Sequence, residues 1–207
     1  MMVIRDNFLS TEEYDDLTNT PMQYAKVHWI GVNAEPENAL HRMVHQIYDK
    51  YVTQKEISGG TAWWNIRPVN PQPHNDISSY CTQNGIDYRP DILPEQTFIY
   101  YVKEPKSGGY LEVYDQYGPK LHKEKCTHHI KPTKNRLISF SANAMHTVQP
   151  YKGNRISVGV IFWPELPTIY GPTNKKINAK WQSEKAKQKK QSRKAMQKSK
   201  AKKQCKK

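Results

Sequence analysis

The residues best suited to chemistry are a histidine and an aspartate two positions apart, His74 and Asp76, within the stretch PQPHNDISSY. In an extended strand, residues two apart point to the same face, so this imidazole and carboxylate could bind one metal ion together. Two ligands do not complete a site, and a third must come from a neighbouring strand. His128 and His129 lie in a charged, turn-rich segment, and we expect them to form an exposed loop pair rather than ligands.

His146 is the preferred third ligand because it lies between two strand-like runs, where an inward-facing polar residue needs a partner. Arg155 begins the most apolar run of the chain, RISVGVIFW, and a buried guanidinium requires an anion. Ser157 should point the same way, so that the two side chains could clamp a carboxylate. An ion pair between Arg155 and Asp115 or Glu112 of the same chain remains the alternative.

Two histidines and one carboxylate that leave other coordination positions open are characteristic of non-haem Fe(II) oxygenases. A carboxylate clamp one strand away adds an acidic co-substrate to this picture. The pair His74 and Asp76 alone is a weak signal. Their order along the chain with His146 and the clamp, all on predicted strands, is a much stronger one.

Two helices are predicted before the strands begin. Ser10 followed by Glu13 resembles a capping box at the start of the first helix. A second helix is predicted from about Pro36 to Tyr51, because apolar residues recur there with the spacing of one helical face. Both helices are expected to support the site rather than to form it.

Short β-branched and aromatic runs follow Gly60, and Gly, Pro and Asn/Asp clusters separate them. No helical pattern interrupts these runs, so they predict an antiparallel sandwich or barrel, in a mainly β protein with N-terminal helices (α+β). The polar stretch 77–96 is expected to be a long loop. Loops of this length inside a domain are usually functional.

Two blocks of the sequence resemble the Fe(II)/2-oxoglutarate-dependent dioxygenases, and specifically their prolyl 4-hydroxylase-like group. IYYVKEPKSGGYLEVYD (99–115) resembles the strand–Gly-Gly–strand signature of that group, and NRLISFSANAMHTVQPYKGNRISVGVIFW (135–163) resembles its closing hairpin. The resemblance extends over roughly 8–163. It implies a double-stranded β-helix, the jelly-roll or cupin-like barrel.

The resemblance also implies roles for individual residues. His74, Asp76 and His146 would bind Fe(II), and Arg155 would pair with the distal carboxylate of 2-oxoglutarate. Three further co-substrate contacts are implied, at Tyr101, Ser157 and Trp64. Gly108 and Gly109 would form a tight bulge beside the site. The alternative for Tyr101 is a core aromatic residue, and Trp63 and Trp64 could equally be core residues.

The implied activity is hydroxylation of a C–H bond, coupled to conversion of 2-oxoglutarate and O2 to succinate and CO2, with ascorbate as a further candidate cofactor. The first hypothesis for the substrate is a peptidyl residue, proline being the default of the group. The stretch 77–96 departs from the family pattern beside the substrate groove, and Tyr80, Asn84, Tyr88 and Arg89 are candidate contacts there. Two alternatives are an oxygenase acting on nucleic acid and a non-catalytic metal-binding β-barrel.

The net charge of +13 is concentrated at the C-terminal end of the chain. Residues 171–207 hold 15 Lys or Arg and one acidic residue, while the other 170 residues hold 17 basic and 18 acidic ones. This Lys-rich, low-complexity tail has too few apolar residues to fold alone, so we expect it to be disordered. From residue 174 onward it could bind nucleic acid or another polyanion, or it could be a solubilising terminus without a partner.

The sequence predicts three segments: N-terminal helical support (1–60), the β-helix core (61–170) and the tail (171–207). No run reaches the roughly 18 apolar residues of a membrane helix. The N-terminus becomes acidic before a secretory apolar core develops. The three cysteines are too far apart in the sequence for a CxxC metal site, and their odd number does not suggest a disulfide framework. We therefore expect a cytoplasmic protein with no membrane partner.

Overall fold

The computed structural model describes residues 2–22, 27–53, 56–66, 73–76, 94–117 and 126–164, with backbone only for 115–117. The Lys-rich tail and most of the predicted loop lie outside these ranges, including the candidate contacts Tyr80, Asn84, Tyr88 and Arg89. The described residues belong to one compact unit, Met1–Leu166.

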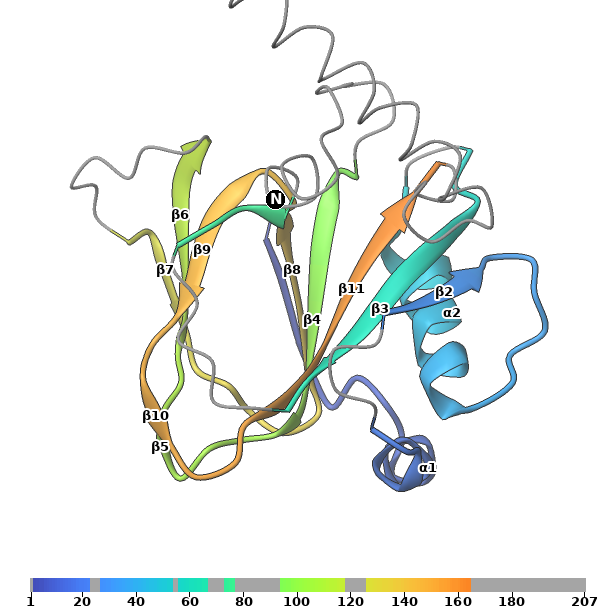
Figure 1. The fold of residues 1–207 in the computed structure, drawn as a ribbon, viewed down its shortest axis with the longest axis horizontal. Helices are drawn as coiled ribbons and strands as arrows, with labels where there is room; N and C mark the ends of the chain where they lie inside the picture. The colour runs from blue at the N-terminus through green and yellow to red at the C-terminus, as the bar shows by residue number, and fades with distance from the viewer. Residues whose placement is uncertain are drawn as a thin grey trace, which may run out of the picture. The chain divides into compact units, whose positions relative to one another are not determined.

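A six-stranded antiparallel sheet forms the larger layer of this unit, with the strand order β1-β8-β4-β11-β3-β2 (Figure 1). Its strands are β1 (Val3–Asp6), β8 (Arg136–Ser141), β4 (Gln96–Lys103), β11 (Ile156–Trp163), β3 (Gly59–Asn65) and β2 (Val27–Gly31). The runs predicted as strands in β3, β4, β8 and β11 are confirmed. The two edge strands, β1 and β2, lie within the segment expected to be helical support.

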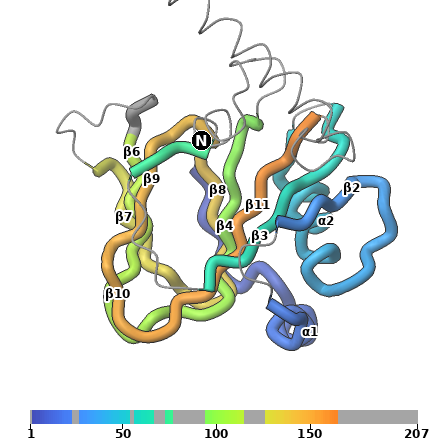
Figure 2. Tube along the Cα trace, in the orientation of Figure 1, coloured from blue at the N-terminus to red at the C-terminus, as the bar shows by residue number. Residues whose placement is uncertain are grey.

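A three-stranded sheet faces the larger one, as the ribbon and the tube both show (Figures 1 and 2). It contains β7 (His128–Ile130), β6 (Leu111–Tyr117) and β9 (Ala144–Val148), and a short pair, β5 (Ser107–Gly108) with β10 (Tyr151–Lys152), lies at one end. Buried side chains from both sheets fill the space between them. This arrangement confirms the expected antiparallel jelly-roll core.

The helices α1 (Thr11–Asn19) and α2 (Ala39–Tyr51) pack on the side of the larger sheet that faces away from the smaller one (Figure 1). The capping box is present, since Ser10 Oγ accepts from the Glu13 amide at 3.3 Å and Glu13 accepts from the Ser10 amide at 2.9 Å. The second helix starts three residues later than predicted. Asn38 caps it by accepting the amide of His41 at 3.0 Å.

Strand register defines what lies on each face of the larger sheet, because successive residues of a strand alternate between faces. We call the side toward the smaller sheet the inner face. Ile99 and Tyr101 pack there, whereas Phe98, Tyr100 and Val102 pack on the outer face with the helices. Three rows of paired residues share the inner face at the centre: Tyr101, Ser157 and Asn65; Ile99, Gly159 and Trp63; Thr97, Ile161 and Thr61.

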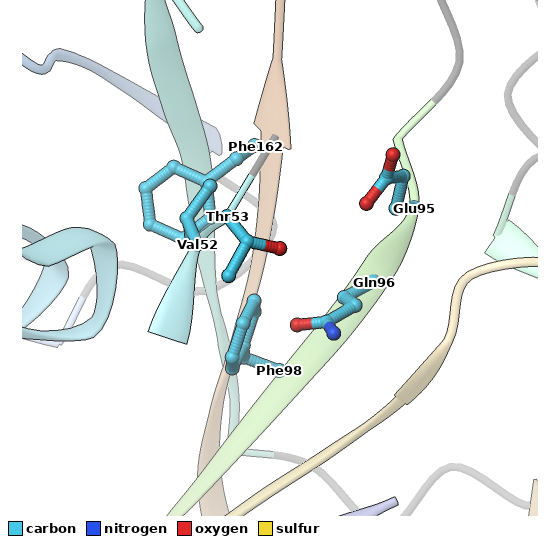
Figure 3. A pocket seen from close by; sticks show the side chains of 6 residues that line it. All are labelled: Val52, Thr53, Glu95, Gln96, Phe98 and Phe162. Carbon is cyan, nitrogen blue, oxygen red and sulfur yellow. The ribbon is translucent and has the colours of Figure 1, made fainter. Parts of the chain in front are cut away.

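A small recess on the outer side is lined by Val52, Thr53, Glu95, Gln96, Phe98 and Phe162 (Figure 3). Phe98 and Phe162 meet edge to face at 5.8 Å between their ring centroids. Since both rings belong to the outer core, the recess is separate from the inner face. Within the described parts of the chain, none of the helices has the length and apolar character required to span a membrane.

His128 and His129 are exposed, as expected, but they lie in strand β7 rather than in a loop. Their backbones pair with Val113 and Glu112 of β6. The local sequence is charged, so its strand character comes from this pairing and not from intrinsic propensity.

Candidate metal and carboxylate site

Three potential metal ligands meet between the two sheets. One ligand atom from each of His74, Asp76 and His146 lies within 4.8 Å of the other two. His74 and His146 are joined by a β-bridge, with amide-to-carbonyl distances of 3.0 and 2.8 Å in the two directions. Their ring centroids are 4.5 Å apart. The predicted trio is therefore brought together from segments 70 residues apart in sequence.

The imidazole of His146 is held in one orientation by its surroundings. Its Nδ1 is 3.2 Å from the carbonyl of Ala144, which accepts its proton, and its Nε2 is 3.8 Å from Asp76 Oδ2. Phe140 packs edge to face against the ring at 4.9 Å. Burial lowers the pKa of His146 below its ordinary value, against the raising effect of Asp76. A neutral ring with its Nε2 lone pair directed at the cluster is the form that binds metals.

Asp76 is not in the extended strand that its spacing from His74 predicted. Of the two residues, only His74 takes part in the β-bridge with His146, and Asp76 lies outside any strand. Its carboxylate is instead oriented by Thr97, whose hydroxyl donates to Oδ2 at 2.6 Å. Thr97 is 1% exposed and occupies the inner face of β4. Sequence analysis missed Thr97, although its position two residues before Ile99 places it on the same face as Tyr101.

The side chains predicted to form a carboxylate clamp also lie together on the inner face. Arg155 is 6% exposed, and its Nη1 donates to Ser157 Oγ at 3.2 Å. The guanidinium carbon lies 5.0 Å from the centroid of the Tyr101 ring, close enough for a cation–π contact. Ser157 and Tyr101 are paired across β11 and β4. The three side chains thus form one cationic, hydrogen-bonding patch.

Several donors of this patch lack an acceptor among the described residues. These are Nε and Nη2 of Arg155 and the hydroxyl of Tyr101, all buried. Burial raises the pKa of Tyr101, so its hydroxyl stays protonated and able to donate. Buried unpaired donors around a fixed positive charge are unfavourable unless an anion accepts from them. A carboxylate supplies the acceptor oxygens that the patch requires.

Glu112, one of the alternative partners of Arg155, is engaged elsewhere. Gln149 donates to its Oε1 at 2.7 Å, and the Tyr114 hydroxyl donates to its Oε2 at 2.9 Å. The side chain of Asp115 lies outside the described part of the structure. The ion pair between Arg155 and Glu112 that the sequence left open is therefore not formed.

The position of Trp64 does not support the predicted co-substrate contact. Trp64 pairs with Val158 across β3 and β11, and both residues belong to the outer core with the helices. At 2% exposure its side chain is buried on the side opposite to Ser157 and Tyr101. The adjacent Trp63 is the residue of this pair that shares the inner face with the clamp.

The glycine pair predicted to lie beside the site has the backbone conformation that requires glycine. Gly108 and Gly109 have φ angles of +72° and +73°. A Cβ on Gly109 would lie 3.3 Å from Arg155 Cδ and 3.0 Å from Pro105 Cγ. The pair therefore permits a tight turn directly against the guanidinium stem.

The same region of the chain matches a known family. Residues 71–163 match the 2OG-Fe(II) oxygenase superfamily, where 2OG denotes 2-oxoglutarate. No similar protein is found among curated protein sequences. Residues 71–163 are therefore a 2OG-Fe(II) oxygenase domain, and this domain makes the protein a 2-oxoglutarate/Fe(II)-dependent dioxygenase. Enzymes of this superfamily use Fe(II), 2-oxoglutarate and O2.

Solved structures of similar fold include two prolyl hydroxylases. A prolyl-4-hydroxylase from Pseudomonas putida is 15% identical, with a TM-score of 0.51 over 80% of this chain and 93% of the other. The viral collagen prolyl hydroxylase of Paramecium Bursaria Chlorella virus-1 is 17% identical, with a TM-score of 0.51 over 78% and 88%. A 2OG-Fe(II) oxygenase family oxidoreductase from Burkholderia pseudomallei is 16% identical, with a TM-score of 0.50 over 79% and 84%. These similarities show a shared fold.

The residues of the site fit both the metal and the co-substrate that the family uses. Two imidazoles and one carboxylate, gathered within 4.8 Å, are the ligand set of non-haem Fe(II) sites. The buried donors of Arg155 and Tyr101 without acceptors in the described structure match the distal carboxylate of 2-oxoglutarate.

Proposed function

We propose that this dioxygenase hydroxylates a C–H bond of a peptidyl residue, with proline as the first candidate, and releases succinate and CO2. The observation that carries the proposal is the gathering of His74, Asp76 and His146 between the sheets that also hold the Arg155 clamp. In this assignment His74, Asp76 and His146 bind Fe(II). Arg155, Ser157 and Tyr101 bind the distal carboxylate of 2-oxoglutarate.

When bound, Fe(II) and 2-oxoglutarate would activate O2 as the oxidant for the C–H bond, with succinate and CO2 as the other products. The contribution of the chain itself is placement and charge. The buried guanidinium of Arg155 neutralises a carboxylate in a site with little water, where electrostatic attraction is strong. The His146 Nδ1 contact with Ala144 and the Thr97 contact with Asp76 fix the directions of two ligands. Such fixed geometry is the main contribution of a protein to cofactor chemistry.

A peptidyl substrate is supported by the fold, which is shared with two proteins described as prolyl hydroxylases. Outside the tail, the chain has no excess of basic residues that would attract the phosphates of nucleic acid. Peptide hydroxylation is therefore the reading that the observations favour.

The reaction class is tested by measuring succinate formed from 2-oxoglutarate with Fe(II) and O2, for wild type and for Asp76→Ala and His146→Ala. Both variants should lose turnover by at least 100-fold, because each removes a metal ligand. His129→Ala is the matched control, since His129 is exposed on β7 and pairs with Glu112, in the row next to that of His146 and on the opposite face of the strand. Full turnover by Asp76→Ala would contradict the assigned site.

The substrate class is tested separately, by mass spectrometry of a proline-containing peptide library incubated with the enzyme, Fe(II) and 2-oxoglutarate. The expected product carries one added oxygen atom on proline, and its yield should disappear with Asp76→Ala. Oxidation confined to nucleic acid in a parallel incubation would overturn the peptidyl assignment while leaving the reaction class intact.

A further inference from the structure

The indole of Trp63 lies against a glycine of the neighbouring strand. Trp63 and Gly159 are paired across β3 and β11. A Cβ built on Gly159 would overlap Cζ2 and Cε2 of the indole and would lie 3.0 Å from Cη2. Any other residue at Gly159 would displace this ring, so the absence of a side chain at Gly159 defines where Trp63 sits.

The rows of the inner face show where this ring lies relative to the carboxylate clamp and the metal ligands. Gly159 lies in the middle row of the inner face, paired on its other side with Ile99 of β4. One row away are Ser157 and Tyr101 of the carboxylate clamp, and one row away in the other direction is Thr97, which binds Asp76. Residues two apart on a strand are about 7 Å apart. Trp63 therefore lies level with the space between the clamp and the metal ligands.

This space is where the carbon chain of a diacid must lie if one end is held at the clamp and the other at the metal. We infer that Trp63, seated on Gly159, forms the apolar wall against the methylene groups of 2-oxoglutarate and sets the length of chain that fits. The inference rests on the proposed function. Trp63 is partly exposed on this face, unlike the buried Trp64, so its ring has surface to offer a ligand.

The chemistry of the wall suits this role. The two methylene groups of 2-oxoglutarate are apolar and lie between two charged ends, so an apolar surface favours their burial without competing for the carboxylates. Ile99 supplies a second apolar side chain in the same row. An indole is large and has few rotamers, which makes it a rigid wall.

The test uses the intrinsic fluorescence of tryptophan in full-length protein loaded with Mn(II), which replaces Fe(II) and prevents turnover. Titration with 2-oxoglutarate should change the emission of the wild type. Trp63→Phe should lose most of this change, whereas Trp64→Phe should keep it, because Trp64 faces the outer core. The two variants remove the same chromophore from adjacent positions, so they are matched controls for each other.

Calorimetry on the same samples measures affinity directly. Trp63→Ala should weaken 2-oxoglutarate binding by up to about tenfold, the equivalent of two methylene groups losing apolar burial. It should also raise the affinity for the six-carbon 2-oxoadipate relative to 2-oxoglutarate, because the wall is withdrawn. Trp63→Phe keeps an aromatic ring and provides a folded variant should Trp63→Ala fail to fold.

The outcomes separate this inference from the proposed function. If the wild type binds Mn(II) and 2-oxoglutarate but Trp63→Phe keeps the full emission change and Trp63→Ala keeps the full affinity, the wall assignment is overturned and the function stands. If the wild type does not bind 2-oxoglutarate at all, both are overturned. Loss of the emission change in Trp64→Phe rather than Trp63→Phe would also refute the assignment.

Discussion

Thr97 donates its hydroxyl proton to Oδ2 of Asp76 over 2.6 Å, across a gap of 21 residues in the sequence. Thr97 is fixed in the central strand β4, whereas Asp76 lies outside any strand. The contact therefore ties a ligand that lies outside the sheet to a central strand of the six-stranded sheet. Hydrogen bonds of this kind, from residues that do not themselves bind the metal, orient the metal ligands. Removing one typically lowers metal affinity or activity by 10–100-fold.

Replacing Thr97 with Val should weaken Mn(II) or Fe(II) binding by about tenfold, because the carboxylate of Asp76 loses its only described hydrogen bond. Thr97→Ser keeps the hydroxyl and should restore most of the affinity. Calorimetric titration with Mn(II) measures both variants. A purely structural role would predict lower thermal stability in Thr97→Val with unchanged metal affinity, and that result would contradict the assignment.

Replacing Arg155 with Lys should raise the KM for 2-oxoglutarate by about 10–100-fold. The guanidinium already donates to Ser157 and has further buried donors for a carboxylate, whereas an ammonium offers a point charge without the planar fork. Steady-state kinetics over a range of 2-oxoglutarate concentrations measures the change. Arg42→Lys, an exposed arginine of helix α2 on the outer side of the sheet, is the control and should leave this KM unchanged.

The strand pattern was sufficient to predict an antiparallel sandwich or barrel, and the family resemblance implied the jelly-roll class. The trio of ligand types could be predicted because its residues follow an ordered pattern along the chain. His146 and Arg155 stand out as polar residues within apolar runs, which is why they could be identified without coordinates. The edge strands β1 and β2 were not predicted. Each is short, and its strand structure comes from pairing with β8 or β3.

The family resemblance implied a co-substrate contact at Trp64, and the resemblance carries no information on strand register. Strand β3 ends at Asn65, so the number of residues between Trp64 and His74 does not determine which way the Trp64 side chain faces. Register does determine it: Trp64 pairs with Val158 and Trp63 with Gly159, and neighbouring residues face opposite sides. That pairing cannot be read from the sequence of β3 alone.

Replacing Asn135 with Ala should lower the free energy of unfolding by about 2–3 kcal/mol. Its side chain accepts from the Leu9 amide at 3.0 Å and the Tyr100 hydroxyl at 2.8 Å, and donates to the Leu9 carbonyl at 2.8 Å. Its φ of +57° adds strain for Ala but not for Gly. Asn135→Gly should therefore be more stable than Asn135→Ala by about 1 kcal/mol. Urea titrations with unchanged slopes measure both, and equal stabilities would contradict the strain argument.

The ion pair between Asp6 and Arg136 should make stability depend on pH in acid. Arg136 Nε and Nη2 donate to the two carboxylate oxygens at 2.5 and 2.8 Å, and these bonds lower the pKa of Asp6 in the folded protein. A lowered pKa means that the stabilisation is present above the unfolded value of about 4 and is lost as pH falls through the folded value.

Asp6 is half exposed, so the effect should be only about 0.5 kcal/mol. Asp6→Asn should be less stable than wild type at pH 7, and the difference should vanish near pH 2 in paired urea titrations. A constant difference across this range would show that the carboxylate charge does not contribute.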